Sequence, residues 1–321
     1  MTIKPIVIIS GEPNSIFSEI LIKAIRNYRN SKPIILIGSY DLITKQLNIL
    51  NIKYKFNLID KKFNNKNISN KKINIIDINY NFKAPFETIS TRSNLYLKEC
   101  FNLAISLSKN YSISGIINGP VSKKYFLNEK FPGVTEYLAY EFKIKKYAML
   151  IYNKKLSVAP ITTHMPIRNI SQKLSKKLII DRAVLINNFY IKYIKKKPKI
   201  AILGLNPHCE NFSKFNEEKE IIEPAIKVLQ KKKLLIFGPL SADSIFMKNN
   251  REKFDVIIGM YHDQVLTPIK ALFNFDSINI TLGLPLIRVS PDHGPNFSMV
   301  KKNKSNPKSL LESIKFLDRL N

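Results

Sequence analysis

Short apolar runs of strand length alternate with segments of helical periodicity along almost the whole of this chain. An apolar run at residues 6–10 comes first, and amphipathic spacing from about residue 15 to 28 follows, which predicts a strand and then a helix. Strands that alternate with helices form a largely parallel sheet with helices packed on its faces. Ligands of such sheets collect beyond the carboxyl ends of the strands, so candidate site residues are expected just after them.

The same patterns define the remaining elements, apart from a Lys/Asn-rich stretch at residues 51–70 that predicts an irregular excursion. Further strands are expected at residues 33–38, 114–118, 148–152, 156–161, 199–205, 234–237, 256–260 and 278–282, and further helices at 42–50, 90–108, 173–193, 217–231 and 307–320. Glycine and proline concentrate in 119–120 and 132–133, which favours a domain boundary near residues 121–135.

Length and composition exclude several classes of protein. The 321 residues are enough for two domains, and 45% hydrophobic with 24% charged residues is ordinary for a globular protein. No apolar stretch approaches the ~18 residues of a membrane span, and the first apolar run is too short for a signal-peptide core. The two cysteines, Cys100 and Cys209, exclude a disulfide framework, so we expect a cytoplasmic protein without membrane contact.

The net charge of +28, from 52 Lys and Arg against 24 Asp and Glu, is the feature that suggests a nucleic-acid-binding module. Only eight of the 52 are Arg, however, and the 44 Lys are spread along the chain. Arg is the residue expected for bidentate phosphate or base contacts. The Lys triads at 195–197 and 231–233 follow predicted helices, where they favour the helix dipole. A solvated basic surface that attracts an anionic substrate is therefore favoured over a nucleic-acid partner.

The four histidines of the chain each follow a predicted strand or apolar run: His164, His208, His262 and His293. Taken singly, each is explained as a hydrogen-bonded polar residue at a strand end. Taken together, they map to the edge where an α/β protein binds its ligand. Three neutral imidazoles with an open position form a catalytic divalent-metal site. The first three are 44 and 54 residues apart, and this spacing leaves both interpretations open.

Charged residues near the histidines add to the metal hypothesis. Asp263 directly follows His262, and Asp243 ends a Gly-Pro-Leu-Ser-Ala-Asp segment, so either carboxylate can accept the second ring N–H of a metal-bound imidazole. The alternative for Asp243 is a residue that satisfies free amides at a helix N-terminus. Arg288 stands in an apolar strand pattern, where its charge needs an anion from the protein or from a ligand phosphate. Lys270 is a weaker candidate of the same kind.

Two familiar kinds of site have no support in this sequence. No glycine set fits GxGxxG or the P-loop pattern, so neither a classical dinucleotide loop nor a kinase-type nucleotide site is expected. Cys209 lies beside His208, but no CxxC spacing accompanies it, and it is predicted to be a small buried residue.

Several segments occur together in one order along the chain. They are Thr-Thr-His-Met-Pro at 162–166, Leu-Asn-Pro-His at 205–208, Gly-Pro-Leu-Ser-Ala-Asp at 238–243, Met-Tyr-His-Asp-Gln at 260–264 and Asn-Ile-Thr-Leu-Gly-Leu-Pro at 279–285, followed by Arg288 and Asp-His-Gly at 292–294. In this order they resemble the 4-hydroxythreonine-4-phosphate dehydrogenase family of vitamin B6 synthesis. The resemblance runs from Gly-Glu-Pro at 11–13 to the final helix and covers essentially the whole chain.

The resemblance implies a two-domain α/β fold related to the isocitrate and isopropylmalate dehydrogenases. It implies a discontinuous first domain of residues 1–125 and 270–321, and a second domain of 126–269 that carries the dimer interface. The enzyme would be a homodimer with shared active sites in the cleft between its domains. It would use a small phosphorylated substrate, NAD or NADP, and one divalent metal per site (Zn, Co or Mg), and its product would pass to pyridoxine 5'-phosphate synthase.

The resemblance also implies roles for particular residues of this chain. The metal ligands would be His164, His208 and His262, drawn from both subunits, with Asp243 and Asp263 maintaining the site. The phosphorylated substrate would be held by Thr135, Lys270, Asn279 and Arg288. The step from His293 to Gly294 is similar to the adenosine-side contact of the related dehydrogenases.

The sequence departs from the family pattern in three places. The family reads Gly-His-Thr-Glu where this chain has Gly-Val-Thr-Glu at 133–136, and Val134 cannot donate a hydrogen bond to a substrate. The family is glycine-rich where this chain has Asn-Ser-Ile-Phe at 14–17, and it has small residues where this chain has Pro-Asn-Phe at 295–297. These changes affect the expected substrate and cofactor preference more than the reaction class.

The expected reaction is oxidation of the secondary alcohol of 4-phosphooxy-L-threonine by NAD(P)+, assisted by the metal acting as a Lewis acid. The resulting β-keto acid would lose carbon dioxide to give 3-amino-2-oxopropyl phosphate. No residue identifies itself as the general base. Because of Val134, a sister dehydrogenase acting on a phosphorylated sugar acid, threonate or erythronate 4-phosphate, stays open as an alternative. A non-catalytic remnant of the same fold is a third hypothesis.

Overall fold

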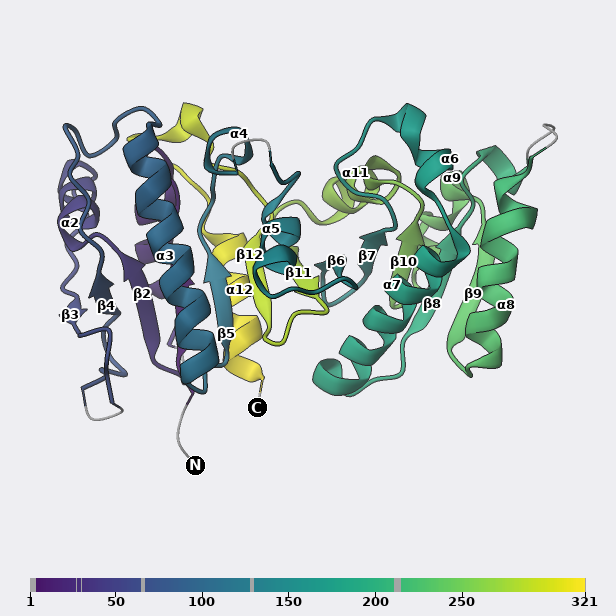
Figure 1. Cartoon of the computed structure of the whole chain (residues 1–321), viewed down its shortest axis with the longest axis horizontal. Coiled ribbons are helices and arrows are strands. Elements are labelled where there is room, and N and C mark those ends of the chain that lie inside the picture. The colour runs from purple at the N-terminus through teal and green to yellow at the C-terminus, as the bar shows by residue number, and fades with distance from the viewer. Residues whose placement is uncertain are drawn as a thin grey trace. The chain divides into compact units, whose positions relative to one another are not determined.

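The computed structural model describes residues 4–26, 28–29, 31–64, 67–127, 130–210 and 215–320 of the chain. It divides into two compact units (Figure 1). The first unit comprises Met1–Val134 and Leu286–Asn321, and the second comprises Thr135–Pro285.

The first unit is a parallel sheet with helices between its strands. Its elements are β1 (Ile6–Ile9), α1 (Phe17–Arg26), β2 (Ile34–Gly38), α2 (Tyr40–Ile49), β3 (Asn57–Leu58), β4 (Asn74–Asp77), α3 (Thr91–Asn110), β5 (Gly115–Asn118), α4 (Lys123–Phe126), β12 (Arg288–Pro291) and α12 (Lys308–Arg319). The strand order is β3-β4-β2-β1-β5-β12, and these neighbours pair in parallel. Parallel strands need crossover connections, which the intervening helices supply.

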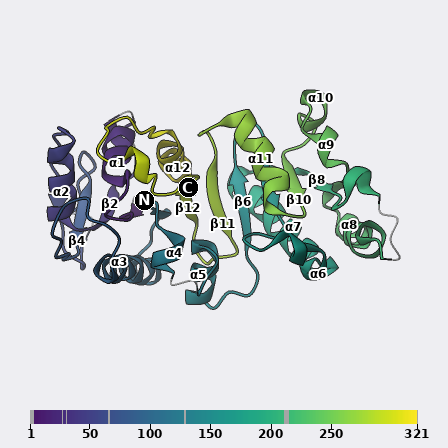
Figure 2. The ribbon, with the colours of Figure 1, turned by 90° about the horizontal axis from the view of Figure 1, so that it is seen from above.

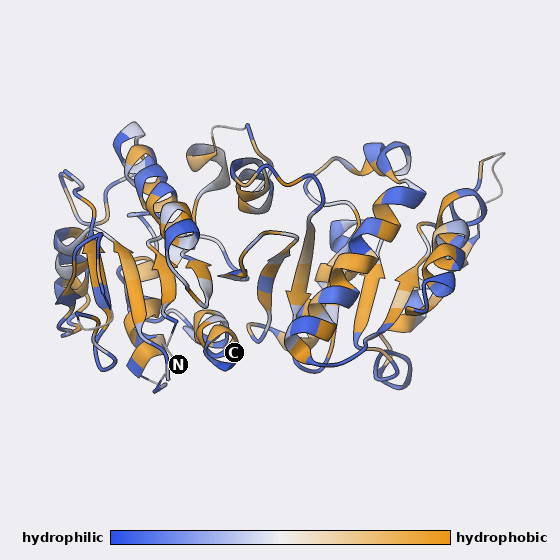
Figure 3. Cartoon of the chain, turned by 60° about the horizontal axis from the view of Figure 1, so that its bottom comes forward, coloured by the Kyte–Doolittle hydropathy of each residue, from blue (hydrophilic) through white to orange (hydrophobic). Residues whose placement is uncertain are grey.

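Helices cover both faces of the first sheet. Helix α3 lies on one face, and α1 and α12 lie together on the other, as the view from above shows (Figure 2). Strands β1, β2, β5 and β12 are buried along their whole length, which is the pattern of a sheet covered on both sides. Figure 3 shows the same arrangement as apolar strands between helices whose other sides are polar.

The second unit is a mixed sheet with helices on both faces. Its elements are α5 (Val134–Glu141), β6 (Ala148–Tyr152), β7 (Ser157–Pro160), α6 (Ile170–Lys173), α7 (Lys176–Phe189), β8 (Lys199–Leu203), α8 (Glu223–Lys231), β9 (Leu235–Leu240), α9 (Ala242–Ile245), α10 (Lys248–Arg251), β10 (Val256–Gly259), α11 (His262–Phe273) and β11 (Ile278–Leu282). The strand order is β11-β6-β7-β10-β8-β9. Strand β6 pairs antiparallel with both β11 and β7, whereas β7, β10, β8 and β9 pair in parallel.

Helix α11 packs on β7 and β10 on one face of the second sheet, and α7 packs on the other face with α8 (Figure 2). The core under α11 contains Val265, Leu266 and Ile269 from the helix and Val158, Ala201 and Ile257 from the strands. Apolar residues three and four apart on α11 form the stripe that a helix buries against a sheet. This packing fixes the start of α11 close to the end of β10.

The predicted fold class, a largely parallel α/β architecture with helices on both faces, is confirmed. Most expected strands and helices agree with the structure to within a few residues. Strands β3 and β4, the shorter helices, α5 and α11 were not predicted, and β12 was expected only as an apolar strand pattern around Arg288.

The boundaries between the units differ from the predicted ones. The first break falls after Val134, inside the range 121–135 that glycine and proline favoured but later than the residue 125 that the resemblance implied. The chain returns to the first unit at Leu286 rather than residue 270. The return is later because β11 pairs with β6 over its full length and α11 packs on β7 and β10, which keeps both elements in the second unit. Among the described helices, none is both long enough and apolar enough to cross a membrane.

Candidate functional site

The carboxyl ends of four parallel strands in the second unit carry the predicted metal-site residues. His164 follows β7, His262 follows β10, His208 follows β8, and Asp243 follows β9. These strands are neighbours in the order β7-β10-β8-β9 (Figure 1), so their carboxyl ends meet at one edge of the sheet. Residues far apart in sequence are therefore brought into one row, at the edge where α/β proteins bind ligands.

His164 and His262 form a pair at this edge. The centroids of their rings are 5.6 Å apart, with the ring planes inclined by 43°. His262 is the first residue of α11, and its Nδ1 lies 2.7 Å from Oδ1 of Asp263. A carboxylate acceptor at Nδ1 favours the tautomer with the proton there, which leaves Nε2 free to bind a cation. The position expected for Asp263 is thus the position that the structure shows.

His208 and Asp243 form a second, looser group. Nδ1 of His208 lies 3.9 Å from Oδ2 of Asp243, and both side chains are largely exposed. The Ser241 hydroxyl donates to Oδ1 of Asp243 at 2.6 Å, and this bond is the main cause that lowers the pKa of the Asp243 carboxyl. His208 lies in a short 3-10 turn, Pro207–Cys209, with φ of 55°, a left-handed conformation that is uncommon outside glycine.

The turn that carries His208 is held by a buried carboxylate. Glu218 is 1% exposed, and its Oε1 accepts hydrogen bonds from the backbone N–H groups of Leu205 at 2.8 Å and Asn206 at 2.9 Å. Its Oε2 accepts a third from the side chain of Asn206 at 3.0 Å. Charge-assisted bonds of this kind are strong enough to hold a strained turn in place.

The structure brings two predicted ligands into one pair, but it does not complete a three-ligand centre within one chain. Over the described residues, no three His, Cys, Asp or Glu side chains are grouped so that they could hold a metal ion. The donors themselves fit a divalent cation, since neutral imidazoles with a carboxylate behind them are the usual ligands of Zn2+ and similar ions. The three-histidine metal site, with ligands drawn from both subunits, thus stays a prediction.

Thr135 and Asn279 lie together at β11. The hydroxyl oxygens of Thr135, in the first turn of α5, and Thr281, in β11, are 3.0 Å apart. Asn279 is two residues before Thr281 and therefore faces the same side of the strand. Its Oδ1 is buried without a hydrogen-bond partner among the described residues. Two of the four predicted substrate residues thus share one location in the second unit.

The start of α5 also contacts the turn that carries His164. The hydroxyl of Thr163 donates to Oε1 of Glu136 at 3.2 Å. Val134, which stands where the family pattern has His, is the first residue of α5 and is 8% exposed. Glu136 and Thr163 were not predicted as site residues, because the residues that meet here are 27 positions apart.

Lys270 lies on α11, eight residues after His262, and its side chain is exposed. The helix rises about 1.5 Å per residue, so the Cα atom of Lys270 is about 12 Å along the helix from that of His262. The predicted substrate role of Lys270 stays a prediction.

Arg288 lies in the first unit as the first residue of β12 and is 2% exposed. Its Nε donates to Oδ1 of Asn118 at 2.8 Å, and Asn118 is the last residue of β5. The sequence analysis expected a protein carboxylate or a ligand phosphate near this charge, and the neutral amide of Asn118 was missed. The amide of Asn118 accepts one hydrogen bond of the guanidinium and so helps to fix its orientation.

His293 and Gly294 follow β12 in the first unit. The Nδ1 of His293 lies 3.1 Å from the carbonyl oxygen of Gly294, and the backbone N–H of the preceding Asp292 donates to the hydroxyl of Ser309 at 2.9 Å. A Cβ atom at Gly294 would meet nothing within 4 Å, so packing within the chain does not require glycine there. The segment is anchored to α12, and the predicted cofactor role of His293 and Gly294 stays a prediction.

Cys209 is only partly buried, which differs from the buried position predicted for it. A Cβ atom at Gly204 would lie 2.7 Å from its Sγ atom, so the cysteine occupies the space above that glycine. Burial raises the pKa of the Cys209 thiol, which keeps it protonated at neutral pH.

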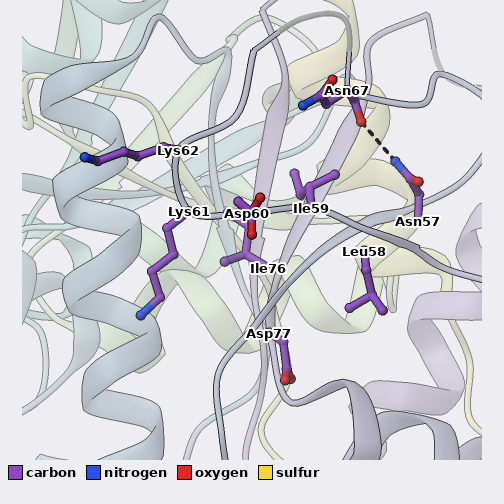
Figure 4. A pocket seen from close by; sticks show the side chains of 9 residues that line it. All are labelled: Asn57, Leu58, Ile59, Asp60, Lys61, Lys62, Asn67, Ile76 and Asp77. Carbon is purple, nitrogen blue, oxygen red and sulfur yellow. Dashed lines mark hydrogen bonds between the residues drawn. The ribbon is translucent and has the colours of Figure 1, made fainter.

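A pocket of about 900 Å3 lies elsewhere, beside the edge strand β3 of the first unit (Figure 4). Its polar lining mixes both signs of charge, Asp60 and Asp77 with Lys61 and Lys62, and Asn57 donates to the carbonyl of Asn67 across it. None of the predicted site residues lines this pocket. We therefore place the candidate site at the histidine-bearing strand ends.

Known proteins are similar to this chain over nearly its whole length. A 4-hydroxythreonine-4-phosphate dehydrogenase from Sulfurihydrogenibium sp. (strain YO3AOP1) is 37% identical over 313 residues, covering 95% of this chain and 94% of that protein. A D-threonate 4-phosphate dehydrogenase from Salmonella typhimurium (strain LT2) is 30% identical over 327 residues and covers 100% of both chains.

Solved structures show the same similarity. The structure of a 4-hydroxythreonine-4-phosphate dehydrogenase from Klebsiella pneumoniae matches with a TM-score of 0.82 at 29% identity, over 98% of each chain. A β-decarboxylating dehydrogenase from Thermococcus kodakarensis shares the fold alone, with a TM-score of 0.50 at 10% identity over 98% of this chain and 82% of that one.

Parallel strands that end in a row of imidazoles, in a fold shared with known dehydrogenases, define the class of this protein as an α/β dehydrogenase. Residues 29–317 match the model of the family described as pyridoxal phosphate biosynthetic protein PdxA. The chain belongs to this family, as the sequence analysis predicted.

Proposed function

We propose that this protein oxidises 4-phosphooxy-L-threonine at its secondary alcohol, with NAD or NADP as hydride acceptor and a divalent cation in the site. The observation that carries the proposal is the pair of imidazoles His164 and His262, 5.6 Å apart at the carboxyl end of a parallel sheet, in a chain of the PdxA family. The name of the relative that is 37% identical supports the choice of substrate.

Three histidines would hold the cation: His164, His262 and His208. Because one chain does not group all three, the proposal includes a homodimer in which both copies contribute ligands to each site. Imidazole ligands suit Zn or Co, whereas Mg would depend on carboxylate and water oxygens beside them. When bound, the cation supplies a Lewis acid for the alcohol oxygen, and the nicotinamide supplies an acceptor for the hydride.

The chain itself orients the ligands and the substrate. Asp263 holds the His262 ring through Nδ1, and Asp243 stands beside His208. The phosphorylated substrate would be bound by Thr135, Asn279, Lys270 and Arg288, and the adenosine side of the nucleotide by His293 and Gly294. A phosphate dianion is complemented by the two cationic residues of this set, and the fork of Arg288 can hold two of its oxygens.

The reaction balances as a two-electron oxidation. The carbinol carbon gives up a hydride and its hydroxyl a proton, which yields a β-keto acid, NAD(P)H and H+. The β-keto acid then loses carbon dioxide to give 3-amino-2-oxopropyl phosphate. In this proposal the protein works in the cytoplasm and its product is passed to pyridoxine 5'-phosphate synthase.

A second candidate is oxidation of a phosphorylated sugar acid, threonate or erythronate 4-phosphate. It is favoured by Val134, which removes a donor that the family pattern has, and by the relative named D-threonate 4-phosphate dehydrogenase. The two substrates differ at the carbon that carries an amino group in one and a hydroxyl in the other. A residue that no longer donates a hydrogen bond changes this discrimination.

Side-by-side turnover separates the two candidates. Initial rates of NADH or NADPH formation are measured with 4-phosphooxy-L-threonine and with D-threonate 4-phosphate as the substrate. We expect kcat/KM to be at least about tenfold higher for the amino acid, which corresponds to about 1.4 kcal/mol of transition-state binding. The opposite ratio would establish the sugar-acid activity, and no turnover of either substrate would refute both.

The cation requirement is tested on His262→Ala and on wild-type protein dialysed against a chelator. Because the imidazole pair is broken, we expect His262→Ala to lose Zn2+ binding in calorimetry and about 100-fold or more in kcat, with an unchanged circular dichroism spectrum. Near-normal turnover by the chelated wild-type protein, with metal analysis showing no residual ion, would contradict the metal assignment.

A further inference from the structure

The side chain of Gln264 joins the two strand ends that carry His262 and His208. Gln264 is the third residue of α11. Its Oε1 accepts a hydrogen bond from the backbone N–H of Met260 at 2.7 Å, and its Nε2 donates to the carbonyl oxygen of Gly204 at 2.8 Å. Met260 directly follows β10, and Gly204 directly follows β8, so one side-chain amide connects both turns.

The two hydrogen bonds of Gln264 connect β10 and β8 just beyond the last backbone pair of these strands. In the register of β10 and β8, Ile258 lies opposite Ile202, so two residues further Met260 lies opposite Gly204. There the strands separate into their turns, and the amide lies between the two backbone groups. One acceptor and one donor of Gln264 match one donor and one acceptor of the backbone, which a carboxylate or an apolar side chain cannot do.

Glycine at the end of β10 leaves the space that this amide occupies. A Cβ atom at Gly259 would lie 2.8 Å from Oε1 of Gln264 and 2.5 Å from Cγ1 of Val265. Both distances are shorter than real Cβ contacts, so a larger residue at Gly259 would displace the start of α11 or the Gln264 side chain. The backbone at the strand end and the position of the amide therefore depend on each other.

Hydrogen bonds at both sides hold the neighbouring turns. The Thr162 hydroxyl, in the turn that carries His164, donates to the carbonyl of Met260 at 2.7 Å. On the other side, Glu218 accepts from the backbone of Leu205 in the turn that carries His208. Gln264 links these two groups of contacts, and through them it connects the turns of all three histidines.

We infer that Gln264 is a positioning residue, which sets the places of His262 and His208 relative to each other through the ends of β10 and β8. The inference rests on the proposed function, because that function makes both histidines cation ligands. Gln264 itself touches neither the cation nor the substrate in this role. Groups behind the metal ligands typically change metal affinity about 10- to 100-fold when they are removed.

Two substitutions of nearly the same size test the inference in the full-length protein. Gln264→Glu keeps an acceptor for Met260 but turns a carboxylate oxygen toward the carbonyl of Gly204. Gln264→Met removes both hydrogen bonds while conserving volume. For each variant, Zn2+ affinity is measured by calorimetry on chelator-treated protein, together with the melting temperature and the separate values of kcat and KM.

Gln230 provides a matched control in the same unit. Its Nε2 donates to the carbonyl of Ile236 at 3.0 Å, between α8 and β9 and away from the histidine-bearing turns. The change Gln230→Glu breaks a bond of the same kind, so it measures how far a general loss of stability affects the site. We expect it to lower the melting temperature without changing Zn2+ affinity.

We expect both Gln264 variants to bind Zn2+ at least about tenfold more weakly and to lose kcat, with KM for the phosphorylated substrate within about twofold. Unchanged Zn2+ affinity in either folded Gln264 variant would overturn the inference, and so would an equal loss in Gln230→Glu. The variants His208→Ala and His262→Ala distinguish failure of the metal assignment from failure of the positioning role of Gln264. If they too keep full Zn2+ affinity, the metal assignment fails; if they lose it while the Gln264 variants do not, only the positioning role fails.

Discussion

Glu12 shows how much a single buried carboxyl costs in this fold. It follows β1, is 2% exposed, and its Oε1 has no hydrogen-bond partner among the described residues. Burial raises the pKa of the Glu12 carboxyl from 4.5 to about 7, although hydrogen bonds from the backbone of Ser122 and the side chain of Ser93 act in the opposite direction. The charged form is therefore disfavoured in the folded state.

The raised pKa makes stability depend on pH. Between about pH 4.5 and pH 7 the folded protein keeps a proton on Glu12 that the unfolded chain has released, so the free energy of unfolding falls as the pH rises through this window. Over this window the free energy of unfolding falls by about 3 kcal/mol. We expect Glu12→Gln, which cannot ionise, to lack this decrease in the free energy of unfolding and to be more stable than the wild type at pH 8. Urea denaturation at several pH values measures the free energy of unfolding of both proteins.

Glu99→Gln is the control for this prediction, because Glu99 is exposed on α3. It should leave the slope of stability against pH unchanged. If Glu12→Gln has the same pH slope as the wild type, the buried carboxyl is not the source of the pH dependence.

Residue types and strand ends predicted where several candidate site residues lie in the fold, but not which residues meet across it. His164 and His262 were found because scarce histidines follow predicted strands, and Asp263 because it is adjacent to His262. Asn118 was missed because it meets Arg288 across 170 residues of sequence. Glutamine at position 264 has no chemical signature, and its role depends on a register that only the fold defines.

At the scale of elements, long periodic segments were predictable and short ones were not. Strands such as β1 and β6 are continuous apolar runs, and α3 is long and begins at a Ser90 capping box. Strand β3 has only two residues, and β4 follows the Lys/Asn-rich stretch. Helix α11 begins with polar residues and contains Pro268, which normally ends a helical pattern.

The contact between α5 and β11 supports a prediction at this scale. Thr135 and Thr281 are both buried and share a hydrogen bond of 3.0 Å. The change Thr281→Val keeps the shape but leaves the Thr135 hydroxyl without this partner. We expect a loss of about 1 to 2 kcal/mol in the free energy of unfolding, together with a higher KM for the phosphorylated substrate because α5 is less firmly placed. Urea denaturation and initial rates measure the two effects.

Thr44→Val serves as the control, since the hydroxyl of Thr44 on α2 is buried without a hydrogen-bond partner among the described residues. It removes no hydrogen bond to a second element and should leave KM unchanged. A normal KM in Thr281→Val would show that the contact between α5 and β11 does not affect substrate binding.

At the scale of the whole molecule, the glycine- and proline-rich residues 121–135 predicted the first break, which falls after Val134, whereas the chain returns to the first unit later than the expected residue 270. The point at which the chain returns to the first unit was not predictable, because an apolar run such as 278–282 has the same pattern in either unit. Pairing with β6 assigns it to the second unit, and sequence periodicity does not encode the partner of a strand.

The net charge of +28 concerns the whole molecule, and it provides the last prediction. A positive field raises the local concentration of an anionic substrate, and salt screens it, since the Debye length falls from about 30 Å at 0.01 M to about 8 Å at 0.15 M. We expect kcat/KM for the phosphorylated substrate to fall several-fold over this range, mainly through KM.

The field comes from lysines spread along the chain rather than from one patch. Replacing the Lys triad 231–233 by Gln lowers the net charge from +28 to +25, and this should change kcat/KM much less than salt does. A salt-independent kcat/KM would show that the excess charge has no part in substrate capture, and strong salt-dependent retention on duplex DNA would revive the nucleic-acid hypothesis.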